Sequence, residues 1–393
     1  MKPKQQRQQE HSSDNNNTGN QDKKESEQPK APSPLRPRKH KDAADRTQAD
    51  SPNPNQKKQK KPSGESSFRV PKSNSRAREI VQAWVQRALD MGVQNLVKEF
   101  QMLAKWIPDN MTCDEFLKNR EFNRYQDVPC QDDRRIVLNW PGVDNDYIHA
   151  NFVATPNSDK RFICTQGPLE GTQFAFWIMV VQEEVESIIM LCNTMECGKI
   201  KCHQYYPLEK NTSRVFGEGD SAIMVTTIDI KNLSAEDPFV RVSRFIVHWK
   251  NRSGENQSRM ISHYQWENWP DRGVPPTNLT AVNVLSHVRG STKPILVHCS
   301  AGIGRTGTIV AIAYVQEKMQ AGLNCMDMND LLKELRSQRP YSIQNEYQYI
   351  YVHRVLLAYF LERYADRHSS CLQGENSEKY KKWVEDYKLL TST

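Results

Sequence analysis

Hydrophobic positions divide the chain into a polar first segment and a longer segment with regular apolar spacing. Residues 1–75 hold few apolar side chains, and Phe68 is their only aromatic residue. Such a segment cannot bury enough apolar surface to offset the entropy lost on ordering, so we predict a disordered tail. From Arg76 to about residue 105 the apolar residues follow helical spacing, which predicts an amphipathic helix with a kink or break at Gly92.

The middle of the chain alternates between strand and helix patterns. Residues 161–169 have the pattern of a strand closed by a Gly-Pro turn, and an apolar helical stretch and a buried strand at 187–192 follow. Residues 222–230, 239–249 and 259–266 predict neighbouring antiparallel strands, which would make the sheet mixed. We therefore predict an α/β fold, a single domain with a twisted mixed β-sheet flanked by helices.

The last third of the chain predicts further helices. One helix ends at residues 336–340, and a long helix opens at 341–348 and continues through about residue 364. Apolar residues in 366–393 predict a terminal helix of unknown role. The predicted organisation is a disordered basic tail over 1–75, one globular domain over 76–365 with its N-terminal helix at 76–105, and a C-terminal extension over 366–393.

The net charge of +7 lies in the tail. Residues 1–75 hold 17 Lys+Arg and 9 Asp+Glu, a net charge of +8, so the rest of the chain carries −1. Basic clusters at 36–41 and 57–61 are compatible with nucleic acid, an anionic membrane or an import receptor as an acidic partner. A solvated tail without a specific partner is the simpler interpretation.

Nine cysteines without regular spacing argue against a disulfide framework, and no apolar run approaches the ~20 residues of a membrane span. The chain also opens without a signal peptide. We expect reduced thiols and a location in the cytoplasm or the nucleus.

Residues 294–308 carry the candidate chemistry. Three consecutive apolar residues, 295–297, predict a strand buried on both faces, and an apolar helix begins after a loop of small residues. Gly302, Gly304 and Gly307 are expected to permit a tight turn in which backbone N–H groups point inward as an anion cradle. The start of the helix adds unpaired N–H groups and the positive end of its dipole.

One thiol and one guanidinium border this cradle. A positive environment lowers the pKa of a thiol below its free value of about 8.5 and so produces a nucleophilic thiolate. Arg305 can hold two oxygens of a phosphoryl group, which makes attack of Cys299 on a phosphate ester the predicted chemistry. The alternatives are a cysteine that only packs and a nucleotide-binding turn, but both glycine-rich nucleotide motifs are absent.

The pattern His298-Cys299-x5-Arg305-Thr306-Gly307 resembles the signature loop of the classical protein tyrosine phosphatases. Further stretches agree in the family's order over about residues 90–365. The resemblance implies hydrolysis of phosphotyrosine in proteins through a phosphocysteine, without a metal or cofactor. The resemblance implies that Cys299 is the nucleophile and that the Thr306 hydroxyl eases departure of the thiolate. The residues that it implies bind the phosphate are Ser300, Ala301, Gly302, Ile303, Gly304 and Arg305.

Four further stretches match family motifs and receive roles from the resemblance. Residues 269–275 resemble the mobile acid loop, with Asp271 as general acid and base. Tyr125 would stack on the substrate ring, and the deep slot that it lines would exclude the shorter phosphoserine. The resemblance also implies that Asp127 binds a backbone amide of the substrate and that Gln344, supported by Gln348, positions the attacking water. It further implies that Glu196 orients Arg305 and that Lys201 contacts Asp271.

Three positions depart from the family pattern. Phe122 stands where Lys is frequent, His149 replaces a usual Asn, and Tyr341 stands where many members have Gly. The first two lie outside the catalytic set, whereas a ring at Tyr341 is expected to narrow access to the site. A catalytically dead phosphotyrosine-binding module and a phosphatase for lipids or phosphoserine are the competing interpretations.

Overall fold

The computed structural model describes residues 75–277 and 279–392. Every element named below lies in the unit that runs from Phe68 to the end of the chain. The predicted disordered tail and its two basic clusters lie outside the described residues.

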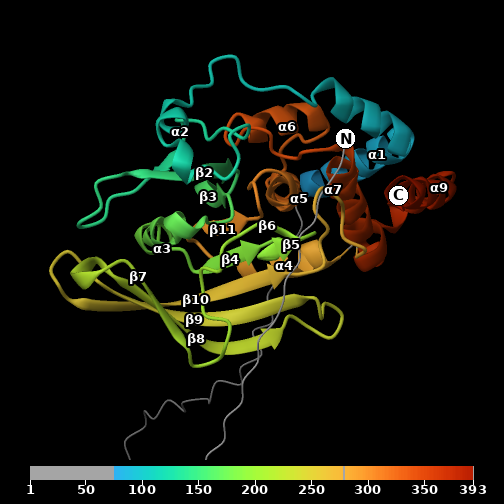
Figure 1. Cartoon of the computed structure of the whole chain (residues 1–393). Helices are drawn as coiled ribbons and strands as arrows, with labels where there is room; N and C mark the ends of the chain where they lie inside the picture. The colour runs from blue at the N-terminus through green and yellow to red at the C-terminus, as the bar shows by residue number, and fades with distance from the viewer. Residues whose placement is uncertain (1–74, 278, 393) are drawn as a thin grey trace, which may run out of the picture. The chain divides into compact units, whose positions relative to one another are not determined.

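A nine-stranded mixed sheet is the centre of the described chain (Figure 1). Its order is β1-β2-β3-β11-β4-β10-β9-β8-β7; β3, β11, β4 and β10 are parallel, and the pairs outside them are antiparallel. The mixed sheet and the antiparallel neighbours predicted from residues 222–266 are therefore confirmed. The sheet strands are β1 (Arg135–Val137), β2 (Tyr147–Thr155), β3 (Ser158–Thr165), β4 (Ser187–Met190), β7 (Ser213–Phe216), β8 (Ile223–Asn232), β9 (Val240–Lys250), β10 (Asn256–Trp266) and β11 (Ile295–His298), and a separate hairpin pairs β5 (Met195–Glu196) with β6 (Lys199–Ile200).

Strand β11 positions the candidate site. All four of its residues are buried, as the continuous apolar run predicts for a strand covered on both faces. Its last residue, His298, pairs with Thr165 of β3 and with Met190 of β4. The loop that follows β11 therefore leaves the carboxyl edge of the central parallel strands, where ligands bind in open α/β sheets.

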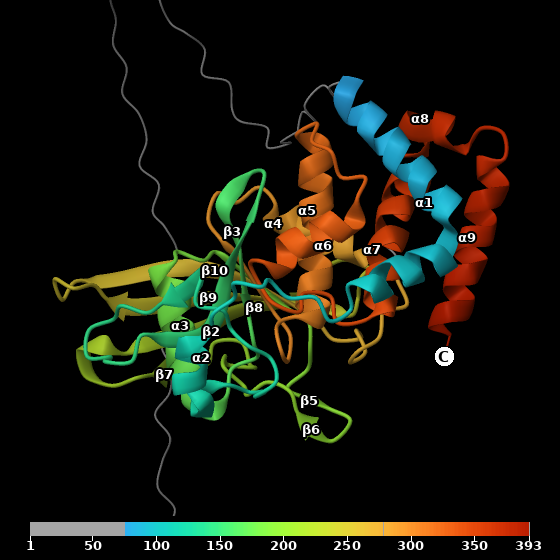
Figure 2. The same cartoon turned by 90° about the horizontal axis from the view of Figure 1, so that it is seen from above.

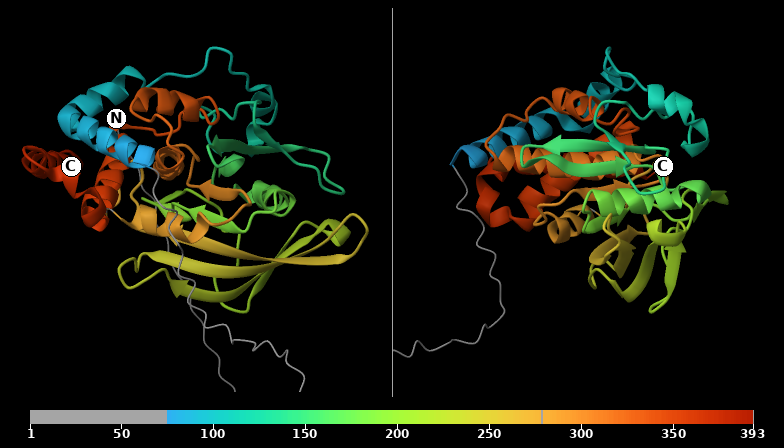
Figure 3. Two further views of the ribbon diagram at one scale, coloured as in Figure 1. Left: turned by 180° about the vertical axis from the view of Figure 1, so that it is seen from behind. Right: turned by 90° about the vertical axis from the view of Figure 1, so that its left-hand side faces the viewer.

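Helices flank the sheet, and those at the two ends of the described chain lie together. Helices α1, α7 and α9 contact one another, and Figures 2 and 3 show α1 beside the C-terminal helices. The α-helices are α1 (Ser75–Met102), α2 (Asp114–Lys118), α3 (Gln173–Gln182), α4 (Thr280–Val288), α5 (Gly304–Gln320), α6 (Met328–Arg336), α7 (Glu346–Ala358), α8 (Ala365–His368) and α9 (Asn376–Thr391). Shorter helical turns are η1 (Arg120–Phe122), η2 (Glu170–Thr172), η3 (Gly219–Ser221), η4 (Tyr359–Arg363) and η5 (Ser369–Leu372).

Two helix predictions are confirmed and one needs correction. Helix α1 is interrupted at Gly92, whose φ of 63° and ψ of 168° are not helical, and the predicted terminal helix is α9. The long helix predicted to open within 341–348 begins at Glu346, after Tyr341 and Ile343 with positive φ angles of 58° and 63°. Its α-helical part ends at Ala358, not at about residue 364, and the π-helical turn η4 continues it to Arg363. Asn345 caps α7 by accepting a hydrogen bond from the Gln348 N–H at 3.1 Å.

No helix within residues 75–277 and 279–392 has both the length and the apolar character that a membrane crossing requires.

Candidate active site

The loop between β11 and α5 surrounds the Cys299 sulfur. Cys299 is 4% exposed, and its Sγ accepts a hydrogen bond from the Gly302 N–H at 3.2 Å. Helix α5 begins at Gly304, so its first unpaired N–H groups lie in the same loop. The sulfur is thus held beside backbone donors at the positive end of a helix dipole.

The three loop glycines have two different functions, which corrects the sequence-based expectation of one tight turn. Only Gly302 has a left-handed conformation, with φ of 73°, and a Cβ at this position would collide with the Thr165 carbonyl. Gly304 and Gly307 are helical residues of α5. A Cβ on Gly307 would lie 2.6 Å from the Ile343 nitrogen, so this glycine permits close packing rather than a turn.

Arg305 is buried and held in a fixed orientation. Its Nη1 and Nη2 donate to the two Glu196 carboxylate oxygens at 2.7 and 2.9 Å, and Nη1 also donates to the Trp269 carbonyl at 3.0 Å. Burial disfavours the charged guanidinium, but the bonds to Glu196 together with the nearby Cys299 and Cys192 outweigh this effect and raise the pKa of Arg305. A permanent planar cation therefore lies beside the sulfur-bearing loop.

Asp271 lies against two cations. Its carboxylate is 2.6 Å from Lys201 Nζ and 3.3 Å from Arg305 Nη2. Burial favours the neutral acid, yet Lys201 and Arg305 together keep the pKa of the Asp271 carboxyl below its ordinary value.

The acid loop is in a folded-over position. The Trp269 carbonyl contacts Arg305, the Trp269 indole N–H donates to the Gly273 carbonyl at 3.0 Å, and its ring packs on Tyr351 with centroids 5.5 Å apart. On the other side, Asn345 Nδ2 donates to the Arg272 carbonyl at 2.6 Å. These contacts hold Asp271 next to the phosphate-sized loop.

The predicted substrate-recognition residues lie around the same loop. The Tyr125 hydroxyl is 2.8 Å from Ser300 Oγ, and Ser300 Oγ donates to the Lys201 carbonyl at 2.9 Å. Asp127 is exposed, as a residue that binds a peptide amide needs to be. Ala301 and Ile303 occupy the remaining loop positions; Ala301 is half-buried and Ile303 is buried.

The two glutamines approach the loop from the far side. Gln348 Oε1 accepts a hydrogen bond from the Gln344 N–H at 2.9 Å. A Cβ on Gly304 would lie 3.0 Å from the Gln348 amide and 3.1 Å from the Gln344 amide, so both side chains face the start of α5. The Thr306 hydroxyl is buried and has no hydrogen-bond partner among the described residues, which leaves it free for a transient bond.

Comparison with known proteins agrees with this geometry. The protein-tyrosine phosphatase family model matches residues 119–358. The chain belongs to the protein-tyrosine phosphatase family. It is 31% identical over 303 residues to human tyrosine-protein phosphatase non-receptor type 9, covering 72% of this chain and 48% of that protein. It is 33% identical over 303 residues to human tyrosine-protein phosphatase non-receptor type 12, covering 72% and 37%.

Solved structures of the family are also similar. The catalytic domain of human protein tyrosine phosphatase non-receptor type 18 superposes with a TM-score of 0.60 at 26% identity, covering 71% of this chain and 99% of that chain. The same phosphatase in complex with a HER2 phosphopeptide gives a TM-score of 0.62 at 28% identity, covering 72% and 99%. The chain described here spans about half the length, or less, of the two human relatives named above.

The sequence does not reveal a set of buried hydrogen bonds, centred on Arg339, that lies beneath the loop between β11 and α5. Arg339 donates to the Gly302 carbonyl at 3.1 Å, to the Ala301 carbonyl at 3.2 Å and to His149 Nδ1 at 3.0 Å. The other nitrogen of His149 lies 2.8 Å from the Val128 carbonyl, and burial with the nearby Arg339 lowers the pKa of His149 to about 3. His149 therefore joins the phosphate loop to the segment after Tyr125, although it touches no catalytic group.

A second feature that the sequence does not reveal is a chain of hydrogen bonds from His263 through Tyr205 and His298 to the Cys299 carbonyl. The Tyr205 hydroxyl lies 2.8 Å from His298 Nε2 and 2.7 Å from His263 Nε2, and His298 Nδ1 lies 3.2 Å from the Cys299 carbonyl. A carbonyl only accepts, so Nδ1 of His298 carries the proton and its Nε2 accepts from Tyr205. His263 then donates through Nε2, and its buried Nδ1 is an acceptor without a partner among the described residues.

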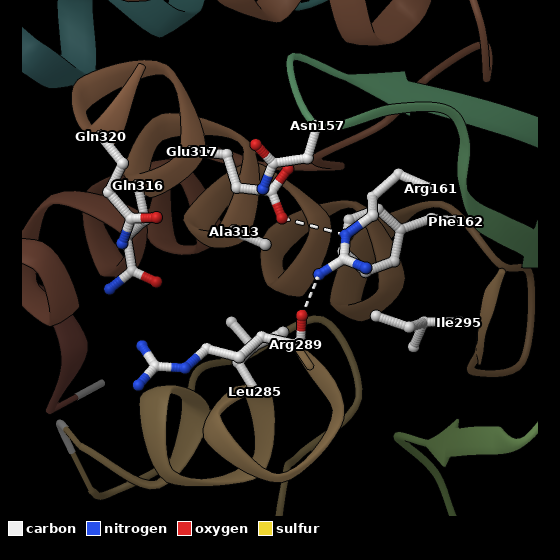
Figure 4. Close-up of a pocket in the computed structure, with 10 residues that line it drawn as sticks. All are labelled: Asn157, Arg161, Phe162, Leu285, Arg289, Ile295, Ala313, Gln316, Glu317 and Gln320. Atoms are coloured by element: carbon white, nitrogen blue, oxygen red, sulfur yellow. Dashed lines mark hydrogen bonds and ion pairs between the residues drawn. The ribbon is translucent and has the colours of Figure 1, made fainter. Parts of the chain in front are cut away.

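A small pocket elsewhere takes no part in the site. It lies among α4, α5 and β3, and none of the predicted site residues lines it (Figure 4). In its lining, Arg161 bonds Glu317 at 3.0 Å and the carbonyls of Arg289 and Ser291 at 2.8 Å. The buried Gln316 Nε2 has no hydrogen-bond partner among the described residues.

Proposed function

We propose that this chain is a protein-tyrosine phosphatase that hydrolyses phosphotyrosine in proteins through a phosphocysteine intermediate. The proposal rests above all on one relationship: Asp271 lies 3.3 Å from Arg305, in a loop folded over the Cys299 loop. A nucleophile, a phosphate-binding cation and a proton donor for the leaving group thereby converge.

In the first step, the Cys299 thiolate attacks phosphorus and the bond to the tyrosyl oxygen breaks. Arg305 and the backbone N–H groups of residues 300–305 bind the equatorial phosphoryl oxygens. Asp271 donates its proton to the leaving oxygen. A bound phosphate dianion neutralises Arg305, one of the three cations that lower the pKa of Asp271, so substrate binding favours the protonated acid.

In the second step, water attacks the phosphocysteine and the sulfur leaves as a thiolate. Gln344, supported by Gln348, orients this water, and Asp271 accepts its proton. The unpartnered Thr306 hydroxyl stabilises the departing sulfur. Glu196 keeps the Arg305 guanidinium in a fixed orientation, and Lys201 binds the Asp271 carboxylate.

Phosphotyrosine is the substrate that the surroundings of Cys299 favour. Tyr125 borders the loop through its bond to Ser300, and a ring that stacks there needs the length of a tyrosyl ester to bring phosphorus to the sulfur. The phosphopeptide complex of the type 18 phosphatase supports a phosphotyrosine peptide as substrate for this chain. A lipid or phosphoserine phosphatase has no comparable support.

The test is phosphate release from matched phosphotyrosine and phosphoserine peptides and from phosphoinositide vesicles. We expect turnover of the phosphotyrosine peptide alone, and its loss in Cys299→Ser. Preference for the vesicles, or full activity of Cys299→Ser, would overturn the proposal. Binding of the phosphotyrosine peptide without any phosphate release would instead identify a catalytically dead binding module.

The remaining assignments are also proposals. Residues 76–365 form the catalytic domain, preceded by a basic tail over 1–75 and followed by an extension over 366–393. The tail contacts an acidic partner, which is a nucleic acid, an anionic membrane or an import receptor, and the chain works in the cytoplasm or the nucleus. Localisation of the full chain and of a chain that lacks residues 1–75 tests these two statements together.

A further inference from the structure

The acid loop is attached to α7 at three points. At its start, the Trp269 ring packs on the Tyr351 ring with centroids 5.5 Å apart. Just past its end, the Thr277 carbonyl accepts a hydrogen bond from the Tyr351 hydroxyl at 2.9 Å. Between these two contacts, Asn345 Nδ2 donates to the Arg272 carbonyl at 2.6 Å. The bond from Asn345 is thus the α7 contact that lies closest along the chain to the general acid.

This bond holds the backbone of the loop, whereas the other contacts near the acid hold its side chain. Arg272 follows Asp271 directly, and in the part of the chain that the structure describes no other residue outside the loop bonds a backbone group of 270–273. The Asp271 carboxylate is held by Lys201 and Arg305 through charge. A general acid must be protonated to act, and protonation of Asp271 removes the charge on which both ion pairs depend.

The bond from Asn345 does not depend on the charge of the acid. An amide N–H and a backbone carbonyl are both neutral, so this bond persists when Asp271 carries its proton. Arg272 also has a φ of 59°, a left-handed conformation that is unfavourable for a residue with a Cβ. The folded-over loop therefore needs a contact that offsets this cost, and the Asn345 amide supplies one.

We propose that Asn345 is a positioning residue for the general acid, and that its amide keeps the acid loop folded over the site while Asp271 is protonated. The inference rests on the proposed function and deepens it, because it adds a residue that acts through Asp271. Asn345 also follows Gln344 directly. The same bond therefore ties the acid loop to the residue that orients the attacking water in the second step.

Asn345 has a second function that the experiment must separate from the first. Its Oδ1 accepts a hydrogen bond from the Gln348 N–H at 3.1 Å and so caps α7. Serine caps a helix as asparagine does, but its short side chain has no amide donor to reach the Arg272 carbonyl. Asn345→Ser therefore keeps the cap and loses the loop bond, whereas Asn345→Ala loses both.

The chain offers a matched control at α6. Asp327 caps this helix by accepting hydrogen bonds from the N–H groups of Asn329 and Asp330 at 2.9 and 3.2 Å. Among the described residues, it makes no hydrogen bond to the acid loop. Asp327→Ala therefore removes a helix cap and leaves the loop contacts in place, so urea unfolding should show a loss of stability without a loss of activity.

The experiment measures kcat/KM for two small esters, because kcat/KM reports the steps up to release of the phenol. Phenyl phosphate has a weakly acidic leaving group that needs the proton of Asp271, whereas p-nitrophenyl phosphate has an acidic one that leaves with little help. For phenyl phosphate, Asn345→Ser and Asn345→Ala should lower kcat/KM by about threefold to tenfold, the effect of one hydrogen bond. For p-nitrophenyl phosphate, both variants should stay within about twofold of the wild type. Asp327→Ala should match the wild type on both esters.

Three results would overturn the inference: a wild-type kcat/KM for phenyl phosphate in Asn345→Ser, an equal loss for both esters, or a loss in Asn345→Ala that Asn345→Ser does not show. The last result would assign Asn345 to helix capping alone. If the wild-type chain hydrolyses neither ester nor any phosphotyrosine peptide, the proposed function itself fails.

Discussion

Lys201 bridges the acid and the substrate-recognition segment, with its Nζ 2.6 Å from the Asp271 carboxylate and its carbonyl 2.9 Å from Ser300 Oγ. The side chain of one residue thus controls the charge of the general acid, while its backbone fixes the hydroxyl that contacts Tyr125. Proton transfer and substrate position depend on the same short segment after β6.

Replacement of Lys201 should change the pH dependence of turnover. Lys201 helps to lower the pKa of Asp271, so Lys201→Met raises this pKa. The general acid acts in its protonated form, which is lost as pH rises through the pKa. The alkaline limb of the kcat/KM profile should therefore move to higher pH in Lys201→Met, whereas Lys201→Arg should stay close to the wild type. A shift of that limb to lower pH would show that Lys201 does not stabilise the Asp271 carboxylate.

Removal of the acid should separate binding from turnover. Asp271→Ala lacks the proton donor but keeps Cys299 and the phosphate-binding groups. We expect kcat to fall by about a hundredfold to ten-thousandfold with little change in the affinity for phosphotyrosine peptide. Single-turnover kinetics and calorimetric titration measure the two quantities. An equal loss of affinity and rate would mean that Asp271 is structural.

Glu196 should matter for stability as well as activity. Glu196→Ala leaves the buried Arg305 guanidinium without its two carboxylate bonds, and the free energy of unfolding should fall by about 3–5 kcal/mol. The kcat/KM for phosphotyrosine peptide should drop by about a hundredfold, because Arg305 is no longer oriented. Urea unfolding and steady-state kinetics measure both effects. Glu196→Gln is the matched control, since the amide oxygen keeps one acceptor for Arg305, and it should lose less on both measures.

Acid should destabilise the fold through buried neutral histidines. His353 stacks on Trp84 with centroids 5.5 Å apart, and its Nε2 has no hydrogen-bond partner within residues 75–277 and 279–392. Burial lowers the pKa of His353 from 6.5 to about 4. Below pH 6.5 the His353 imidazole binds a proton in the unfolded chain but not in the folded chain. The free energy of unfolding therefore falls as pH drops from 6.5 to about 4. The free energy of unfolding of His353→Phe should have a shallower slope over this range in urea titrations. An unchanged slope would mean that His353 is charged in the folded state.

The sequence predicts the central strand and the chemistry of its loop because both depend on local patterns. Three apolar residues mark β11, and Cys299 and Arg305 are spaced to border one phosphate. The exact first residue of α7 within 341–348 is not predicted, because helical spacing does not reveal the positive φ angles of Tyr341 and Ile343. The positive φ of Tyr341 also shows that this segment adopts a turn without the glycine that many family members have there.

Contacts between distant segments are the other part that sequence patterns miss. Arg339 ends a helix segment in the sequence and looks like a surface charge, yet it is fully buried beneath the loop carbonyls. Gly307 looks like a turn residue, but its role comes from the approach of Ile343 from a segment 36 positions later. Hydrogen bonds between segments far apart in the chain leave no periodic signal.

The most direct test of the account is to trap the covalent intermediate. Rapid acid quench of the full chain with a phosphotyrosine peptide, followed by mass spectrometry of its proteolytic fragments, locates the phosphoryl group. Phosphate should be found on Cys299, in a larger trapped fraction in Gln344→Ala, where water is poorly oriented, and should be absent in Cys299→Ser. Phosphate on another residue, or steady turnover by Cys299→Ser, would contradict it.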